Sequence, residues 1–320
     1  MNKGSMVPFE DDGYDRFMKN EGRKWIEENV GKFRFESHDG GRLQAFCAVP
    51  DNPRAAVVMV HGFCEFFGKY HELFYDFLHE GYAVFFYEQR GFGRSLREVD
   101  DKDAVYVRDF ADYVRDLDVF VAEVRRRIGS GLDLMLFAHS MGGCVGALYL
   151  EEHPETFTRA VLSSPMLKMA LRGRTGVRAV CGVQKVLGRL GHLAVGQRRF
   201  DGRPDFEHSC ALSPARYSYQ FNQRLKDAEY QTNGATYAWV GAALKAERKL
   251  MRDADRVRVP VLICSAGRDD MVDVSGQHEF AAKNALVRIE DFPDAKHEIF
   301  NASGEILARY YHVLFEFYGE

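Results

Sequence analysis

The sequence lacks the marks of several special protein classes. Six cysteines are scattered over 320 residues, with no C-x-x-C pair and no histidine at metal-ligand spacing, so we expect neither a disulfide framework nor a metal site. No apolar run reaches the roughly 18 residues that a membrane-spanning helix needs. Internal repeats and low-complexity linkers are also absent. These absences leave an ordinary globular protein with reduced, buried thiols.

The N-terminal stretch 1–10 has no apolar core, so no secretory signal is expected there. With no membrane span expected either, the sequence indicates a cytoplasmic protein. Its residues are 46% hydrophobic and 13% aromatic, which is enough to bury the core of one large α/β domain with an insertion.

Acidic residues are missing from one segment. Residues 168–200, called here the basic segment, contain eight Lys or Arg and no Asp or Glu, although the whole chain has a net charge of −4. Apolar residues lie between the basic ones, as in an element that contacts an anionic membrane surface. A helix whose basic residues simply face water explains the pattern about as well. Nucleic-acid binding is not expected, because no recognised binding motif accompanies the charge.

The hydrophobic pattern predicts an α/β fold. From residue 55 onward, continuous apolar runs alternate with helical stretches, one of them over 105–128, which is typical of a mostly parallel sheet covered on both faces. Before it, 13–30 reads as an amphipathic helix, and 32–37 and 42–47 as an antiparallel hairpin at the sheet edge.

The alternation stops between about residues 168 and 255. We therefore expect residues 1–167 and 256–320 to form the core domain, and 168–255 to form an inserted helical cap above Ser140.

Ser140 is the candidate nucleophile. Residues 138–143 read AHSMGG and directly follow the apolar strand pattern 134–137. A small-X-Ser-X-Gly turn between a strand and a helix exposes the serine hydroxyl, and Gly142 meets its need for small residues.

Two further side chains follow in the order that such a nucleophile needs, first an acid and then a histidine. Asp269 lies in the turn after the strand pattern 260–264, with Asp270 as its rival, while Asp273 fits the N-cap of the next helix. His297 follows the strand pattern 286–290 and is the one histidine in the expected context.

A possible oxyanion hole lies after the strand pattern 55–60. The loop begins with His61 and Gly62, so the backbone N–H of Phe63 is the expected first donor, and Met141 is expected to supply the second. His61 fits the role of a loop-holding residue. Glu65 either braces the loop or faces solvent.

These segments resemble the monoacylglycerol lipase and bacterial lysophospholipase family of the α/β-hydrolases. The likeness includes the oxyanion-loop segment, the nucleophile segment and the KHEI segment at 296–299, and it weakens over 168–215. Glu88 stands where the family usually has Asp. The resemblance implies an α/β-hydrolase fold, with a mostly parallel central sheet and an inserted helical cap.

The resemblance also implies a serine hydrolase that cleaves esters of single-chain lipids, a lysophospholipid or a monoacylglycerol, without a cofactor. A short-chain carboxylesterase or an acyltransferase with the same triad is the alternative, and a non-catalytic binding protein of this fold is a more distant one. The basic segment is the candidate for peripheral contact with the inner face of the membrane.

Overall fold

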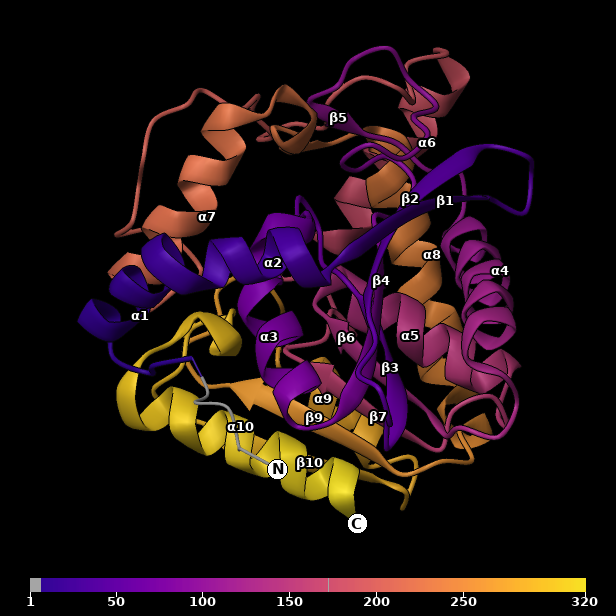
Figure 1. Cartoon of the computed structure of the whole chain (residues 1–320). Coiled ribbons are helices and arrows are strands. Elements are labelled where there is room, and N and C mark those ends of the chain that lie inside the picture. Colours follow the sequence, from indigo (N-terminus) through magenta and orange to yellow (C-terminus); the bar gives the residue numbers. More distant parts are fainter. Residues whose placement is uncertain (1–6, 172) are drawn as a thin grey trace.

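The computed structural model describes residues 7–171 and 173–320 (Figure 1). Residues 1–6 of the expected signal-free N-terminus, and Arg172 of the basic segment, lie outside the described residues. Among the described residues, no helix is both long and apolar enough to cross a membrane.

An eight-stranded sheet runs through the centre of the molecule in the order β1-β2-β4-β3-β6-β7-β9-β10. Only β2 runs against its neighbours, so the sheet is mostly parallel, as predicted, with an antiparallel hairpin at its edge. The strands are β1 Gly31–Glu36, β2 Arg42–Ala48, β3 Ala55–Val60, β4 Tyr82–Tyr87, β6 Leu134–His139, β7 Arg159–Ser163, β9 Val261–Ala266 and β10 Val287–Phe292. A separate short pair joins β5 Ala104–Val105 to β8 Gly234–Ala235.

Helices cover both faces of the sheet. They are α1 Asp11–Phe17, α2 Arg23–Asn29, α3 His71–His79, α4 Phe110–Ile128, α5 Met141–Glu152, α6 Arg174–Val186, α7 Pro214–Lys226, α8 Tyr237–Asp253, α9 Ser275–Ala281 and α10 Gly304–Gly319, with a π-helical turn Met18–Gly22 between α1 and α2. The helix expected over 105–128 begins later, because the Asp109 side chain caps it by accepting a hydrogen bond from the Ala111 N–H.

The central strands are buried on both faces, because successive side chains point to opposite sides of the sheet. On β3, Val57 and Met59 pack with α3 and α10, whereas Ala56, Val58 and Val60 pack with α4, α5 and α8. This explains why the strands read as continuous apolar runs. A rigid sheet results, and its carboxyl-end loops carry the candidate site.

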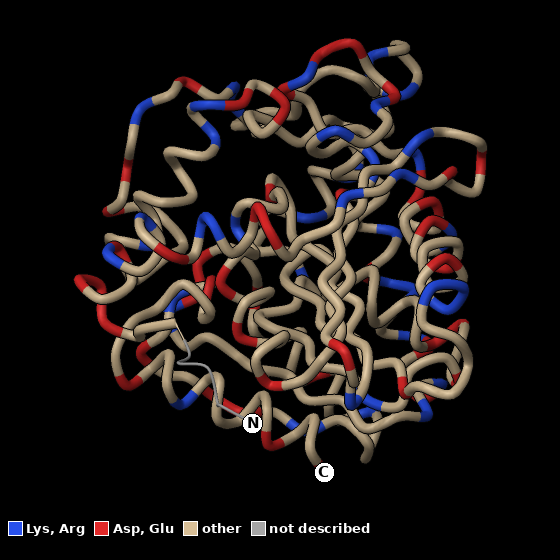
Figure 2. The backbone as a smooth tube through the Cα atoms, in the orientation of Figure 1, with Lys and Arg blue, Asp and Glu red and all other residues tan. Residues whose placement is uncertain are grey.

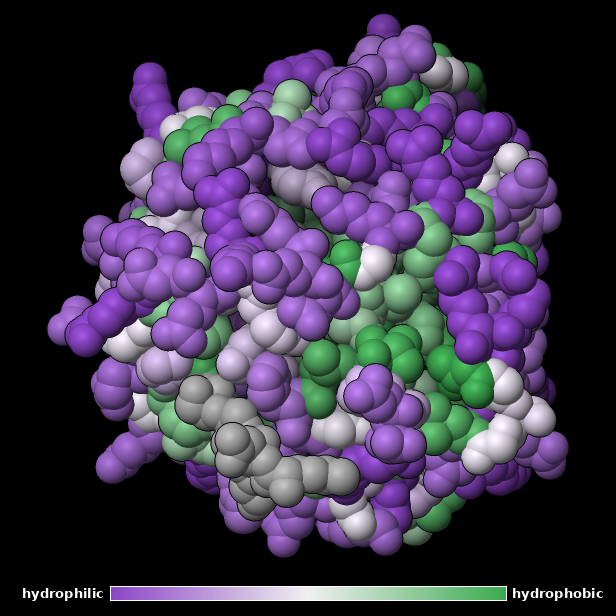
Figure 3. All heavy atoms as spheres, viewed as in Figure 1, coloured by the Kyte–Doolittle hydropathy of each residue, from purple (hydrophilic) through white to green (hydrophobic). Residues whose placement is uncertain are grey.

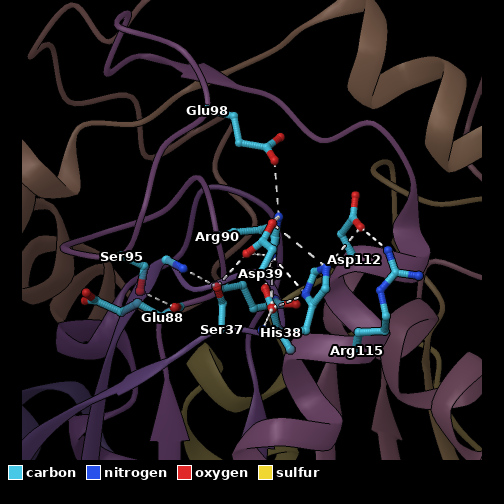
Figure 4. A network of polar contacts seen from close by, with 12 residues as sticks. Ser37, His38, Asp39, Glu88, Arg90, Ser95, Glu98, Asp112 and Arg115 are labelled. Atoms are coloured by element: carbon cyan, nitrogen blue, oxygen red, sulfur yellow. Dashed lines mark hydrogen bonds and ion pairs between the residues drawn. The ribbon is translucent and has the colours of Figure 1, made fainter.

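A buried arginine attaches the edge hairpin to α4. Arg90 donates through Nε to Asp116 (2.7 Å) and through Nη2 to Asp39 in the β1–β2 turn (3.1 Å). His38 also contacts Asp116, at 2.7 Å. Figure 4 shows Arg90 beside Asp39 and His38 of the hairpin turn, with Asp112 of α4 close to His38. His38, Asp39 and Asp116 lie close enough together to share a cation, and the Arg90 guanidinium fills that role.

A second buried arginine joins α7 to the N-terminal segment. Arg216 donates two hydrogen bonds to Glu72 of α3 (2.8 and 2.6 Å) and two more to the backbone oxygens of Pro8 and Phe9. Its guanidinium also lies 4.2 Å from the centroid of the Tyr14 ring. In Figure 1, α7 accordingly lies directly above α1.

The chain between β7 and β9 contains α6, α7, β8 and α8. Helix α8 packs against α5, and α6 packs on α8, while α7 lies on the side of the N-terminal helices. The division into a core and a cap at 168–255 stays a prediction.

Candidate active site

Ser140 lies in a strained turn between β6 and α5. Its φ of 53° and ψ of −118° lie in a region that non-glycine residues rarely adopt. The turn is possible because Gly142 lets α5 approach β3, since a Cβ there would come within 2.2 Å of the Val60 carbonyl oxygen. The serine hydroxyl is thereby presented above the carboxyl end of the sheet.

The structure brings three of the expected side chains into one chain of hydrogen bonds. His297 Nε2 lies 2.9 Å from Ser140 Oγ, and His297 Nδ1 lies 2.6 Å from Asp269 Oδ2. The other oxygen of Asp269 accepts from the backbone N–H groups of Met271 (2.9 Å) and Val272 (3.1 Å). Because a carboxylate only accepts, His297 carries its proton on Nδ1 and leaves Nε2 free to accept the serine proton.

The rival Asp270 and the expected capping residue Asp273 lie outside this hydrogen-bond chain. Asp270 is exposed. Asp273 accepts hydrogen bonds from the N–H and hydroxyl of Ser275 at the start of α9. The N-cap residue of α9 is Val274, so Asp273 lies one residue before the capping position that we expected for it.

The two expected oxyanion donors flank the serine. Met141 is the first residue of α5, so its N–H has no partner within the helix. Phe63 follows Gly62, whose position is so close to Ser140 that a Cβ would lie 3.0 Å from the serine Cβ. Among the described residues, neither the Phe63 N–H nor the Met141 N–H has a protein acceptor.

His61 holds the loop rather than reaching the serine. Its Nδ1 lies 2.7 Å from the Gly62 carbonyl oxygen, and its Nε2 lies 2.9 Å from the Gln89 backbone nitrogen. Burial lowers the pKa of His61 to about 4, so the ring is neutral near pH 7 and can donate to one partner while accepting from the other.

Glu65 is buried and braces the same loop. It accepts hydrogen bonds from the Gly62 N–H, from the Tyr70 hydroxyl (2.6 Å) and from the Lys69 ammonium (2.7 Å). The ring of His139 lies 3.2 Å away on the same carboxylate. Burial by itself would raise the pKa of Glu65, but Lys69 and His139 lower it well below its ordinary value, so Glu65 is a carboxylate.

Lys69 also binds Glu298, the residue after His297. One buried ammonium therefore joins two carboxylates from the oxyanion loop and the histidine loop. We refer to Glu65, Lys69 and Glu298 as the ion triplet. Asn301 completes it by donating to Glu298 at 2.8 Å.

The family assignment follows from comparison with known proteins. The model of the hydrolase family described as "Serine aminopeptidase, S33" matches residues 51–303, a stretch that includes Ser140, Asp269 and His297. The chain belongs to this S33 family. The helices α1 and α2 and the β1–β2 hairpin precede the matched stretch.

Individual relatives show which kinds of hydrolase the chain resembles. The chain is 26% identical over 246 residues to "Probable lysophospholipase L2" of Haemophilus influenzae, covering 77% of this chain and 78% of that protein. It is 28% identical over 280 residues to the monoacylglycerol lipase of Mycolicibacterium smegmatis, with 86% and 93% covered. The expected resemblance to this lipase and lysophospholipase group is therefore confirmed.

A solved structure of the same kind matches the fold. A soluble variant of the monoglyceride lipase of Saccharomyces cerevisiae, in complex with a substrate analogue, superposes with a TM-score of 0.69 at 17% identity, covering 91% of this chain and 96% of that one. The predicted α/β-hydrolase fold is thus confirmed.

Lys69 and Glu298 were not identified from the sequence as part of the candidate site. Lys69 lies four residues after Glu65, a spacing that could have indicated an ion pair. Glu298 is 229 residues away from Lys69, and only the fold brings the two together.

We expect Lys69→Met to destabilise the protein by about 3–5 kcal/mol, because two buried carboxylates lose their shared cation. Their pKa values should then rise above those of the unfolded chain. The folded variant would bind more protons than the unfolded one above about pH 4.5, so its free energy of unfolding should fall as pH rises from 5 to 8.

Urea unfolding of wild type and variant across that pH range would measure this effect. In the wild type both carboxylates have lowered pKa values, so their contribution is present above about pH 4.5 and is lost in acid. Lys69→Arg is the control that keeps the charge. A pH-independent loss in Lys69→Met would contradict the electrostatic role of the triplet.

Proposed function

We propose that this protein is a serine hydrolase that cleaves carboxylic esters of single-chain lipids, either lysophospholipids or monoacylglycerols, through an acyl-enzyme intermediate. The main support is the hydrogen-bond chain from Ser140 through His297 to Asp269, with Phe63 and Met141 as backbone donors beside it. The names of the two relatives favour single-chain lipid esters over other acyl compounds.

In the first half-reaction, Ser140 Oγ attacks the ester carbonyl carbon while His297 Nε2 takes the hydroxyl proton. The carbonyl electron pair moves onto oxygen, where the N–H groups of Phe63 and Met141 stabilise the negative charge. The intermediate then collapses, the ester C–O bond breaks, and His297 gives its proton to the leaving alcohol. Asp269 keeps the imidazole oriented and stabilises its cation.

In the second half-reaction, water replaces the alcohol. His297 takes a proton from the water as its oxygen attacks the acyl carbon, and returns it to Ser140 Oγ as the fatty acid leaves. His297 thus passes the serine proton to the leaving alcohol and a water proton back to Ser140, and these steps balance with the residues named. If a second alcohol replaced the water, the same steps would give acyl transfer, and a short-chain ester would use the same residues.

We expect Ser140→Ala to lower kcat on the order of 10⁶-fold, as in other triads, while the fold persists. The assay is hydrolysis of p-nitrophenyl butyrate, p-nitrophenyl palmitate, 1-monooleoylglycerol and lysophosphatidylcholine by wild type and variant, with circular dichroism as the folding control. Activity confined to butyrate would replace the lipase by a short-chain esterase. Failure of a fluorophosphonate to label Ser140 would favour a non-catalytic binding protein.

We expect Asp269→Asn to lower kcat by about 10⁴-fold, because the amide stabilises the wrong histidine tautomer. Asp270→Asn is the matched control, since Asp270 is the adjacent residue and is exposed. Steady-state kinetics of the two variants on one ester substrate would test the assignment. A larger loss in Asp270→Asn would contradict it.

We also propose that residues 168–255 act as the cap and that α6 contacts an anionic membrane surface from the cytoplasmic side. Support comes from exposed apolar side chains on and after α6: Val183 is 56% exposed, Val186 is 87% exposed and Leu187 is 54% exposed. Arg178 and Lys185 are exposed on the same helix. Figures 2 and 3 show basic and hydrophobic residues close together at the top of the molecule, where α6 lies.

We expect the protein to sediment with vesicles that contain phosphatidylglycerol and much less with phosphatidylcholine vesicles, because basic residues attract anionic lipid. Replacing Val183, Val186 and Leu187 by serine should weaken the binding several-fold. Leu286→Ser is the control, because Leu286 is exposed outside α6. Equal binding to neutral vesicles would exclude the electrostatic contribution.

A further inference from the structure

A cavity of about 690 Å³ lies between α7, the loop that precedes it and the oxyanion loop. Its lining includes Cys64, next to the oxyanion donor Phe63, and Glu298, next to His297. Cys210, in the loop that precedes α7, also lines the cavity. Its carbonyl oxygen accepts a hydrogen bond from the Glu298 N–H at 3.1 Å, which joins this loop to the loop that carries His297. The cavity therefore lies beside the loops that carry Phe63 and His297, and its volume is within the usual range of small-molecule sites.

The cavity has more basic than acidic side chains. Five cations line it, namely Lys69, Arg198, Arg199, Arg203 and Arg224, against three carboxylates, namely Asp201, Asp205 and Glu298. Two of the cations are already matched, because Lys69 binds the carboxylates of its triplet and Arg199 binds Asp101. Within the described part of the chain, Arg198, Arg203 and Arg224 make no ion pair with a carboxylate, and Asp201 and Asp205 are the lining carboxylates outside the pairs just named. A preference for an anion therefore depends on where the single arginines lie rather than on the total charge of the cavity.

Of the three arginines without a carboxylate partner, Arg224 is the one held by several hydrogen bonds. Its Nε donates to the Tyr230 carbonyl oxygen (3.1 Å), and its Nη2 donates to the Thr232 carbonyl oxygen (3.0 Å) and to Asn233 Oδ1 (3.3 Å). The guanidinium lies 4.4 Å from the centroid of the Phe200 ring. Among the described residues, its Nη1 donates no hydrogen bond.

A largely buried guanidinium without a carboxylate partner has lost hydration that no opposite charge replaces, so binding an anion would stabilise its charged form. Burial lowers the pKa of Arg224, because desolvation disfavours its charge. An anionic ligand would restore the lost stabilisation, and phosphate matches the planar guanidinium donors.

We propose that this cavity binds the phosphate of a lysophospholipid headgroup, with Arg224 as its contact, and that it selects phosphate-bearing esters over neutral ones. The proposal rests on the proposed function. It agrees with the reaction geometry, because the headgroup is part of the leaving alcohol and must lie beside His297, which returns the proton to it. A free phosphate ester would present the same phosphate group to Arg224, so the experiment must distinguish the phosphate of a lipid substrate from that of a free phosphate ester.

The test compares 1-oleoyl-glycerol 3-phosphate with 1-monooleoylglycerol, which differ only in the phosphate. Losing a charge-assisted contact in Arg224→Gln should lower the kcat/KM ratio of the phosphate-bearing to the neutral ester by about tenfold or more. Arg224→Lys should keep part of the preference. Lys226→Gln is the matched control, an exposed cation on the same helix outside the cavity, and its ratio should equal that of the wild type.

Calorimetric binding of glycerol 3-phosphate tests the cavity independently of catalysis. The affinity should be lower in Arg224→Gln than in the wild type. Arg224 also holds the 230–233 loop, so melting temperatures are measured alongside. If Arg224→Gln does not fold, the exposed pair Arg198→Gln/Arg203→Gln should shift the ratio in the same direction.

Cleavage of both lipids with an unchanged ratio in folded Arg224→Gln would overturn the proposal. Arg224-dependent binding of glycerol 3-phosphate with an unchanged ratio would also overturn it, because the cavity would then serve a free phosphate ester. Failure to cleave either lipid would instead refute the proposed function. In that case, Arg224-independent binding of glycerol 3-phosphate would refute the cavity as well.

Discussion

The candidate site depends on one buried ammonium group. Lys69 is held between Glu65 and Glu298, and these carboxylates belong to the loops that carry Phe63, the candidate oxyanion donor, and His297, the candidate general base. Two like charges would otherwise repel each other in a medium of low dielectric, and each loop would have to move or take up a proton. The single positive charge allows both loops to lie next to Ser140.

The other polar groups around the candidate site already have their hydrogen-bond partners and settled charges. In the proposed reaction, the main new charge is the one that forms on the substrate oxygen. Burial lowers the pKa of His61 to about 4, so this ring is neutral. Asp269 accepts hydrogen bonds from two backbone N–H groups in addition to its contact with His297. Such a site has little to reorganise when the oxyanion forms, which is the main electrostatic advantage of a preformed site. The strained turn at Ser140 adds to this rigidity, since its position is set by Gly142 against β3.

Much of this arrangement could be predicted from the sequence, because local patterns determine it. The apolar runs at 55–60 and 134–137 gave β3 and β6, and the residues directly after such runs are the ones that meet at the carboxyl edge of a parallel sheet. That is why Ser140 and His297 could be selected. The choice of Asp269 over Asp270 was harder, since both lie in one turn and only the backbone path decides which faces the histidine.

Features that join distant segments could not be predicted. The contact between Lys69 and Glu298 spans most of the chain. The cavity arginines come from a region with little strand pattern, where sequence shows charge but not which cations are already paired. Whether the basic residues pair internally depends on acids such as Asp101 and Glu247, which lie in other segments.

Arg216 and Arg224 occupy the same helix. Arg216 clamps one end of α7 to Glu72 and to the chain at Pro8 and Phe9, and Arg224 lies about 12 Å further along the helix axis. One end of α7 is therefore fixed to Glu72 and the N-terminal segment, and the other end carries Arg224 of the cavity lining. Pro8 and Phe9 precede the stretch 51–303 shared with the S33 family, so residues before the matched stretch help to position a helix that lines the cavity. Under the proposed function, changes in the N-terminal segment would alter substrate selection without replacing Ser140, His297 or Asp269.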